Sequence, residues 1–199
     1  MPCIPFPVVL ASASPRRRRL LAELIPAFAV VPADVDEEAI TCADPYATAE
    51  RLARAKASAV AHRHPNAVVI GGDTVVAISQ SDDASSDWEM LAKPADAEDA
   101  VRMLRKLTGR THLVVTGICL VWPGGERTFH DASWVTFRPA SEQEIRTYVA
   151  TGEPLDKAGA YGIQDASHDF CTRIDGSTAN VVGLPTEKLG RVLRELWGD

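Results

Sequence analysis

A short apolar run that leads into a helix-start signal constrains the fold of this chain most. Residues 8–10 are all apolar, and Ser14 and Pro15 follow them after three small residues. A serine hydroxyl can accept an unpaired backbone N–H at the start of a helix, and proline suits the first helical position, which needs no N–H. We therefore expect a strand that turns directly into a helix, starting at Pro15 and ending before Pro26.

The first turns of this helix are unusually basic. They contain Arg16, Arg17, Arg18 and Arg19. The positive end of the helix dipole disfavours cations, so Arg16 and Arg17 are costly there unless an anion compensates. Together with the hydroxyls of Ser12 and Ser14 and the free backbone N–H groups of a helix start, these two arginines could form a binding site for a polyphosphate. The alternative is a solvated helix face, because arginine is a good helix former. We expect Arg18 and Arg19 to lie on such a solvated face, whereas both the anion site and the solvated face stay open for Arg16 and Arg17.

Composition limits the classes of protein to which the chain can belong. It has 199 residues, 46% of them hydrophobic, which is enough for one well-filled domain over residues 1–199. The net charge of -6 argues against a general nucleic-acid binder, so the local basic cluster favours a small anionic ligand. No stretch approaches the ~20 apolar residues of a membrane span. The cysteines form no C-x-x-C pair and fit a reducing compartment. We expect a cytoplasmic protein without a membrane partner.

A carboxylate stands inside another apolar run. Residues 68–70 and 75–78 are apolar, and Gly71, Gly72 and Asp73 lie between them. Charged groups are rarely buried without a partner, so Asp73 should meet a cation, a metal ion or a catalytic proton. The two glycines let another group approach the backbone closely. The alternative is a Gly-Asp bulge or turn that interrupts the strand.

The rest of the chain mixes helices and strands. Helix signals predict helices over 45–62, 96–109 and 141–152, and a last one after Pro185. Strand-like runs cover 28–31, 112–122 and 127–137, with a hairpin turn at 123–125. We expect a loop at the acidic residues 34–38, a mobile hairpin tip at 79–87 and a turn at 174–176. This mixture predicts an α/β or α+β fold with a mixed sheet.

Three lysines stand near these features. Pro94 holds Lys93 in an extended conformation. Lys157 begins a segment of glycines and small residues that ends at Gln164, which suits a loop that approaches a ligand closely, with Lys157 as a phosphate partner. Lys56 lies within the predicted helix 45–62, where a lysine is usually exposed.

Five segments in order closely resemble the Maf family. They are S-A-S-P-R-R at 12–17, G-D-T-V-V at 72–76, K-P at 93–94, K-A-G-A-Y-G-I-Q at 157–164 and G-L-P at 183–185. Together they span nearly the whole chain and are far more specific than any one motif. The resemblance implies an ITPase-like fold, in which an elongated mixed sheet with flanking helices forms two lobes around a cleft, and a homodimer.

The resemblance also implies an activity. It implies a nucleoside triphosphate pyrophosphatase, an enzyme that hydrolyses a nucleotide between its α and β phosphates and releases the monophosphate and pyrophosphate. Asp73 matches the family's proposed proton acceptor. Other active-site positions are matched by Ser12, Arg16, Glu37, Lys56, Lys93 and Gln164. The positions associated with base choice are matched by Arg17, Thr74 and Gln164. These three resemble the subgroup acting on dTTP and UTP, which implies house-cleaning of pyrimidine nucleotides.

The chemistry of the residues supports this activity. A triphosphate carries about four negative charges at neutral pH, and cleavage of its α–β bridge depends on charge neutralisation. The cations available are Arg16, Lys56, Lys93 and Lys157. The site also needs a divalent ion, and the carboxylates of Asp36, Glu37 and Asp73 are hard oxygen ligands suited to Mg²⁺ or Mn²⁺. Asp73 is a base, a metal ligand or both. Thr74 and Gln164 can hydrogen-bond a pyrimidine edge.

Two departures from the family pattern and two rival functions stay open. Asp165 stands where relatives have glycine, so the loop has a different exit or an added charge near the base. Thr178 stands where an aromatic residue is often found. One rival is a nucleotide-binding regulator of septum formation, and the other is a pyrophosphatase for modified purine triphosphates. The histidines have no metal-ligand spacing and are expected to serve packing or the surface: His62, His64, His112, His130 and His168.

Overall fold

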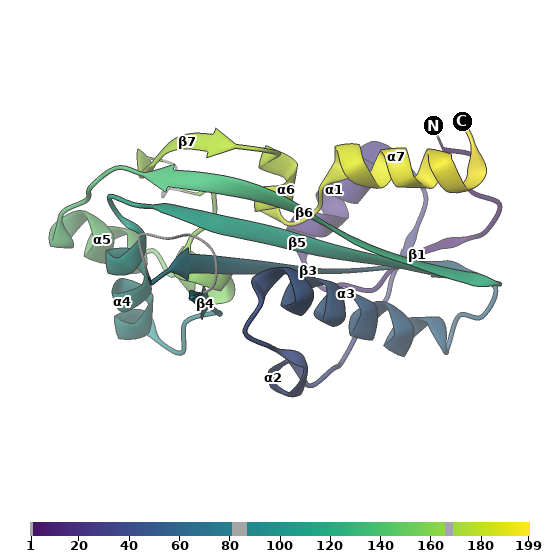
Figure 1. The fold of residues 1–199 in the computed structure, drawn as a ribbon, viewed down its shortest axis with the longest axis horizontal. Helices are drawn as coiled ribbons and strands as arrows, with labels where there is room; N and C mark the ends of the chain where they lie inside the picture. The colour runs from purple at the N-terminus through teal and green to yellow at the C-terminus, as the bar shows by residue number, and fades with distance from the viewer. Residues whose placement is uncertain (1, 81–86, 166–168) are drawn as a thin grey trace.

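One long mixed sheet runs through the computed structural model, which describes residues 2–80, 87–165 and 169–199 (Figure 1). Its strands are β1 (Val8–Leu10), β2 (Ala29–Val30), β3 (Val68–Ser79), β4 (Trp88–Leu91), β5 (Thr111–Trp122), β6 (Gly125–Phe137) and β7 (Cys171–Asp175). They lie in the order β2-β1-β3-β5-β6-β7, and β4 also pairs with β3. β2, β1 and β3 are parallel, and the other pairs are antiparallel. The predicted mixed sheet is confirmed.

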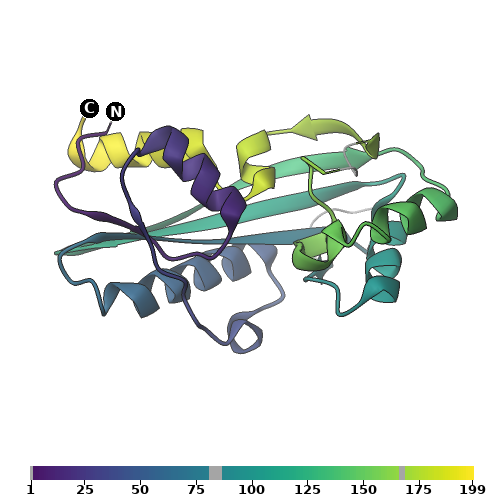
Figure 2. The same cartoon turned by 180° about the vertical axis from the view of Figure 1, so that it is seen from behind.

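Helices pack on the sheet and at one of its ends. They are α1 (Pro15–Leu24), α2 (Glu37–Ile40), α3 (Pro45–Ala61), α4 (Ala97–Leu107), α5 (Glu142–Val149), α6 (Thr178–Val182) and α7 (Thr186–Trp197), with the short 3-10 helices η1 (Glu153–Asp156) and η2 (Ala158–Ala160). α3 lies on one side of the sheet and α1, α6 and α7 lie on the other (Figures 1 and 2). Among the described residues, no helix has both the length and the apolar character needed to cross a membrane.

β3 is continuous through the glycine-aspartate segment. Residues 69–77 pair one by one with residues 113–121 of β5, without a register shift. The alternative of a bulge or turn at Asp73 is therefore wrong. The base of the predicted hairpin at 79–87 is also present, because Ser79 pairs with Trp88; its tip, 81–86, lies outside the described residues.

Two sequence expectations about local structure are wrong. The acidic segment expected to be a loop contains a short helix, α2, because the Asp36 side chain accepts the Ala39 N–H at 3.2 Å and caps it. The turn expected at 174–176 begins only at Gly176, which has a φ of 126°. The residues before it form β7, an edge strand whose backbone pairs with β6.

Glycines let α3 approach the sheet backbone. A Cβ at Gly71 would lie 2.3 Å from the Ala53 carbonyl oxygen, and one at Gly117 would lie 2.2 Å from that of Ala49. No side chain fits in that space. The close approach predicted from the glycine pair is confirmed, and it brings the polar residues of α3 next to β3.

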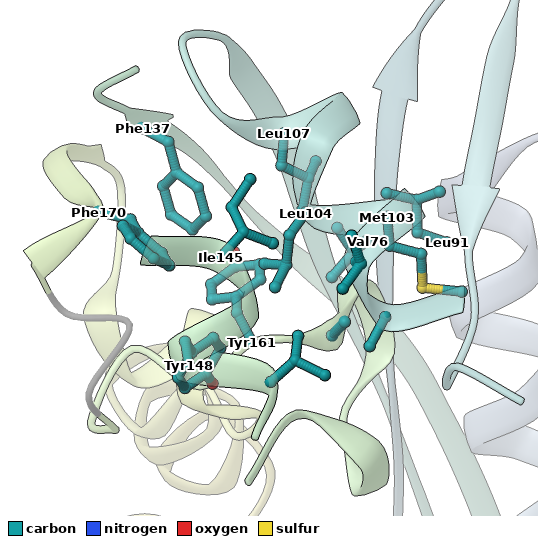
Figure 3. Packing of buried hydrophobic residues seen from close by; sticks show 14 of the residues in the cluster. Val76, Leu91, Met103, Leu104, Leu107, Phe137, Ile145, Tyr148, Tyr161 and Phe170 are labelled. Atoms are coloured by element: carbon teal, nitrogen blue, oxygen red, sulfur yellow. The ribbon is translucent and has the colours of Figure 1, made fainter. Parts of the chain in front are cut away.

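The apolar core forms separate clusters at the two ends of the sheet. One joins β3 and β4 to α4 and α5, and includes Leu104, Phe137 and Tyr161 (Figure 3). Another joins α1 and α7 to β1, β3 and β5. A pocket between them is lined by Val76 and Tyr161 from the first cluster and Val182 from the second. This is the arrangement of two lobes around a cleft that the sequence led us to expect.

Candidate active site

The pocket opens where β3 changes its strand partner. Along one edge, β1 pairs with residues 68–70 and β4 pairs with residues 76–79, while β5 covers the opposite edge. In the described part of the chain, no strand pairs with residues 71–75 on the first edge. Asp73 and Thr74 lie in this gap and line the pocket. Because successive strand residues point to opposite faces, a ligand in the gap can reach groups from both sides of the sheet.

The N-terminus of α1 forms one wall of the pocket. Ser14 caps the helix by accepting the Arg17 N–H at 3.3 Å, and the buried Ser12 hydroxyl accepts the Ser14 N–H at 3.2 Å. The predicted strand-to-helix junction is confirmed. Ser14 and Arg16 line the pocket, and the Arg16 guanidinium lies 3.4 Å from a carboxylate oxygen of Asp156. Free N–H groups of a first helical turn attract anions.

Arg17 ties three segments together. Its Nε donates to the Gly183 carbonyl at 2.9 Å, and its terminal nitrogens donate to the hydroxyls of Ser12 at 3.3 Å and Thr74 at 3.0 Å. Burial lowers the pKa of this guanidinium, although Asp73 opposes the shift. Gly183 has a φ of 121°, which favours glycine at this helix end. These contacts hold the Arg17 guanidinium beside Thr74.

Asp73 has the cationic partner that its burial predicts. Only 8% of the residue is exposed, and its Oδ1 accepts a hydrogen bond from the Lys56 ammonium at 2.6 Å. Lys56 also lies 2.7 Å from an oxygen of Glu37 in α2. Its side chain is only 12% exposed, so the expectation that a lysine in this helix is a surface residue does not hold. α3 can hold it there because Gly71 lets the helix lie close to β3.

Glu37 is held in its charged form. Burial alone would raise the pKa of this carboxyl, but the hydrogen bond and charge of Lys56, with smaller effects of Lys93 and Arg17, place it below the ordinary 4.5. A lowered pKa in the folded state stabilises the fold above the ordinary pKa, and this contribution is lost as the pH falls through the folded-state value.

We expect Glu37→Gln to lower the free energy of unfolding at pH 7 by an amount that begins to shrink as the pH falls below 4.5 and vanishes once the pH is below the lowered pKa of the folded state, where Glu37 is protonated in both states. Urea unfolding between pH 7 and pH 3 measures this difference. Glu38→Gln, the neighbouring exposed change in the first turn of α2, is the control. A difference that stays constant over this pH range would contradict the prediction.

The two lysines expected to meet phosphate have different surroundings. Lys93 is exposed, lines the pocket and, among the described residues, has no ion-pair partner. Lys157 is 8% exposed and lies 2.8 Å from carboxylate oxygens of both Asp156 and Asp165. Burial would lower the pKa of Lys157, but these two carboxylates raise it. The structure therefore shows Lys157 neutralised by aspartates rather than free to meet a phosphate, and Asp165, the departure from glycine, as one of its partners.

Gln164 has a contact that was not predicted from the sequence. Its Oε1 accepts a hydrogen bond from the guanidinium of Arg19 in α1. We expected Arg19 to be an ordinary surface residue of the helix, and this contact corrects that expectation. A signal was present, since Arg16 and Arg19 are three residues apart and so lie on one helix face. The loop that carries Gln164 has no sequence periodicity that would place it next to α1.

The expected carboxylate set for a metal is only partly assembled. In the described ranges, no group of three or more histidine, cysteine, aspartate or glutamate residues could hold a metal ion. Asp36 is exposed and caps α2. Glu37 and Asp73, by contrast, both contact one ammonium nitrogen, so their oxygens face a common point. Magnesium is often bound by one or two carboxylates together with substrate phosphates and water. Glu37 and Asp73 are thus hard oxygen donors for a divalent ion that arrives with a polyphosphate, which would share these carboxylates with the Lys56 ammonium; Asp36 does not belong to this pair.

Two buried or half-buried histidines serve packing, as expected. His112 is fully buried, lies 2.8 Å from the Tyr161 hydroxyl, and has a pKa lowered to about 3 by burial. His130 lies 2.7 Å from Glu50. His168 lies outside the described residues.

The structure brings together most of the residues singled out from the sequence. The pocket is lined by Ser14, Arg16, Arg17, Asp73, Thr74, Lys93, Lys157 and Gln164. Ser12, Lys56 and Glu37 lie behind this lining and contact it through Arg17 and Asp73. The result is a pocket whose lining combines a helix N-terminus, cations, a buried carboxylate and the neutral hydrogen-bonding groups of Thr74 and Gln164.

Comparison with known proteins identifies close relatives. A family model described as Maf-like protein matches residues 7–196. The dTTP/UTP pyrophosphatase of Koribacter versatilis is 47% identical over 187 residues, which cover 94% of this chain and 93% of that one. The dTTP/UTP pyrophosphatase of Myxococcus xanthus is 49% identical over 178 residues, covering 89% and 86%.

Solved structures show the same fold at lower similarity. The Ham1 protein of Staphylococcus aureus matches with a TM-score of 0.53 and 17% identity, covering 95% of this chain and 98% of that one. A HAM1 protein from Coxiella burnetii matches with a TM-score of 0.52 and 15% identity, covering 96% and 99%. These likenesses concern the fold alone and agree with the ITPase-like architecture expected from the sequence.

Proposed function

We propose, because this chain belongs to the Maf family, that it is a nucleoside triphosphate pyrophosphatase whose substrates are dTTP and UTP. It would hydrolyse the bond between the α and β phosphates and release the monophosphate and pyrophosphate. The observation that carries this proposal is the buried Asp73, held by Lys56 beside the basic N-terminus of α1. The relatives named dTTP/UTP pyrophosphatase support the choice of base.

In the proposed complex, the triphosphate binds to the charged groups of the pocket. Ser14 and Arg16 at the start of α1 line the pocket, and Lys93 adds an exposed cation to the same lining. Such groups neutralise the phosphate charges and hold the α–β bridge in one position. Asp156 already holds Arg16 at 3.4 Å, which limits the conformations of its long side chain.

Asp73 activates water in this mechanism. One carboxylate oxygen is fixed by Lys56, so the other can orient a water molecule and accept its proton as the water oxygen bonds to phosphorus. The bridging P–O bond breaks, and pyrophosphate leaves with its charge balanced by the cations of the pocket. A divalent ion held by Glu37 and Asp73 would add Lewis-acid stabilisation of the phosphate charges.

The products and the base preference test this function. Incubation with dTTP or UTP and Mn²⁺ should yield the nucleoside monophosphate and pyrophosphate. Orthophosphate and a nucleoside diphosphate would contradict the assigned bond. A panel of bases should place dTTP and UTP first, whereas a panel led by modified purine triphosphates would favour the rival enzyme. The same assays with Mg²⁺, Mn²⁺ and a chelator test the metal requirement.

We also propose that the enzyme is a cytoplasmic homodimer without a nucleic-acid partner. The net charge of -6, together with a pocket whose lining includes Arg16, Arg17, Lys93 and Lys157, supports a small anionic ligand. Size-exclusion chromatography with light scattering measures the oligomeric state, and a monomer at micromolar concentration would contradict the dimer.

A further inference from the structure

We infer that Thr116 and Arg19 are positioning residues that fix the direction of the hydrogen bonds which Thr74 and Gln164 offer to a base. Neither residue belongs to the pocket lining, whereas Thr74 and Gln164 do. The inference deepens the proposed function and rests on it for the kind of ligand. It explains, from protons and lone pairs alone, how the pocket would accept uracil or thymine and reject cytosine.

Thr116 has its single proton committed. It is fully buried in β5, directly opposite Thr74 in β3. Its hydroxyl donates to the Asn180 carbonyl oxygen at 2.8 Å, and a carbonyl can only accept. Asn180 is itself fully buried and fixed, since its amide donates to Val114 and Ser133 and its Oδ1 accepts the Thr116 N–H. The direction of the Thr116 hydroxyl is therefore set by a rigid part of the core.

This commitment sets the direction of the Thr74 hydroxyl. The two threonine oxygens lie 3.0 Å apart, and because the Thr116 proton is used elsewhere, Thr74 donates to Thr116. Arg17 donates to the Thr74 oxygen at 3.0 Å. A hydroxyl has one proton and two lone pairs, so one lone pair remains. Thr74 can accept a hydrogen bond from a ligand and cannot donate one.

Arg19 sets the direction of the Gln164 amide in the same way. A guanidinium has donors and no acceptor, so the Gln164 atom that faces it must be the oxygen. The NH₂ group of the amide is then left for the ligand. The pocket thus offers an acceptor at Thr74 and a donor at Gln164.

This pair is complementary to an imide. Uracil and thymine present an N–H donor beside a carbonyl acceptor, whereas cytosine presents a ring nitrogen acceptor beside an amino donor. In the same orientation, the ring nitrogen of cytosine would face the Thr74 acceptor, and its amino group would face the Gln164 donor. A site built to hydrogen-bond one pattern rejects a ligand that leaves its polar groups unpaired.

Isothermal titration with the α,β-imido analogues of UTP and CTP tests the inference without turnover. We expect the wild type to prefer the UTP analogue. Thr116→Val frees the Thr74 proton and should reduce the preference about tenfold, the effect of roughly one mismatched hydrogen bond. Thr116→Ser keeps the hydroxyl and should retain the preference. Arg19→Gln frees the amide to rotate and should also reduce it, whereas Arg19→Lys and the neighbouring Arg18→Gln should not.

Three outcomes would overturn the inference. They are equal affinity of the wild type for both analogues, an unchanged preference in Arg19→Gln, and an unchanged preference in a Thr116→Val protein with a melting temperature near that of the wild type. If Thr116→Val does not fold, the test rests on Arg19→Gln with Arg19→Lys as its control, because Arg19 is exposed. A protein with the expected preferences that leaves UTP intact would refute the proposed hydrolysis and support this inference, so the two failures are distinguishable.

Discussion

Asp73→Asn should lower kcat for dTTP and UTP by about 10³-fold, within the range expected when a general base is removed. Asparagine keeps the shape of the side chain but cannot accept the proton of the attacking water. The fold should persist, because the Lys56 ammonium keeps its contact with Glu37 at 2.7 Å. Steady-state rates of pyrophosphate release measure the effect, and the affinity for α,β-imido UTP should change much less than kcat.

Asp175→Asn is the matched control for this change. Asp175 ends β7, has a 67% exposed side chain and pairs only with the nearby Arg173 among the described ion pairs. Its replacement should leave kcat within about twofold of the wild type, since a surface ion pair contributes little. A kcat of Asp73→Asn within tenfold of the wild type would remove Asp73 from the mechanism. If that variant instead loses hydrolysis and keeps a cell-division phenotype, the rival binding role gains support.

Lys56→Met should have the largest effect on stability, lowering the free energy of unfolding by about 3 kcal/mol, the lower end for a buried charge that loses its partner. The change leaves the carboxylates of Asp73 and Glu37 facing a common point with no cation. The lower end applies because half of the Glu37 side chain, 51%, is exposed. Urea unfolding at pH 7 measures the loss, and activity should fall with it because Asp73 is no longer held.

A double variant and a surface control test the cause of this loss. Lys56→Met with Asp73→Asn should recover part of the stability lost by Lys56→Met alone, because one of the two unpaired carboxylates is gone. Lys106→Met breaks a more exposed pair with Glu89 and should cost less than about 1 kcal/mol. A loss below that value in Lys56→Met, or a double variant no more stable than the single one, would contradict a tightly coupled site.

Local sequence patterns predicted the elements whose cause is local. Ser14 and Pro15 set the start of α1, and the box formed by Ser141 and Glu144 caps α5 as expected. The two strand-like runs on either side of the turn at 123–125 predicted the hairpin of β5 and β6. These features depend on residues within a few positions of each other. The exceptions, α2 and β7, are short elements, and β7 is stabilised by pairing with β6 rather than by its own sequence.

The site was predictable in its charges but not in their pairing. The position of Asp73 in an apolar run predicted a cation, a metal ion or a catalytic proton as its partner, and the structure supplies a cation, Lys56, 17 positions away. Both Lys93 and Lys157 were candidates for phosphate partners from the sequence. Only the fold distinguishes them, because η1 and the following loop place Asp156 and Asp165 against Lys157 and leave Lys93 exposed.

The sequence by itself determined that a strand leads into a basic helix N-terminus, that Asp73 stands within an apolar run and needs a partner if it is buried, and that these features occur in a Maf-like order. These conclusions follow from local propensity and from the cost of burying charge, which act wherever the residues are placed. Tertiary structure alone decided which hydrogen-bond donors and cations remain available to a ligand. Thr116, Asn180 and Arg19 acquire their roles from cross-strand register and from the meeting of segments more than 40 positions apart. A hydrogen bond has a direction only when both partners are in place, and that requires the complete fold.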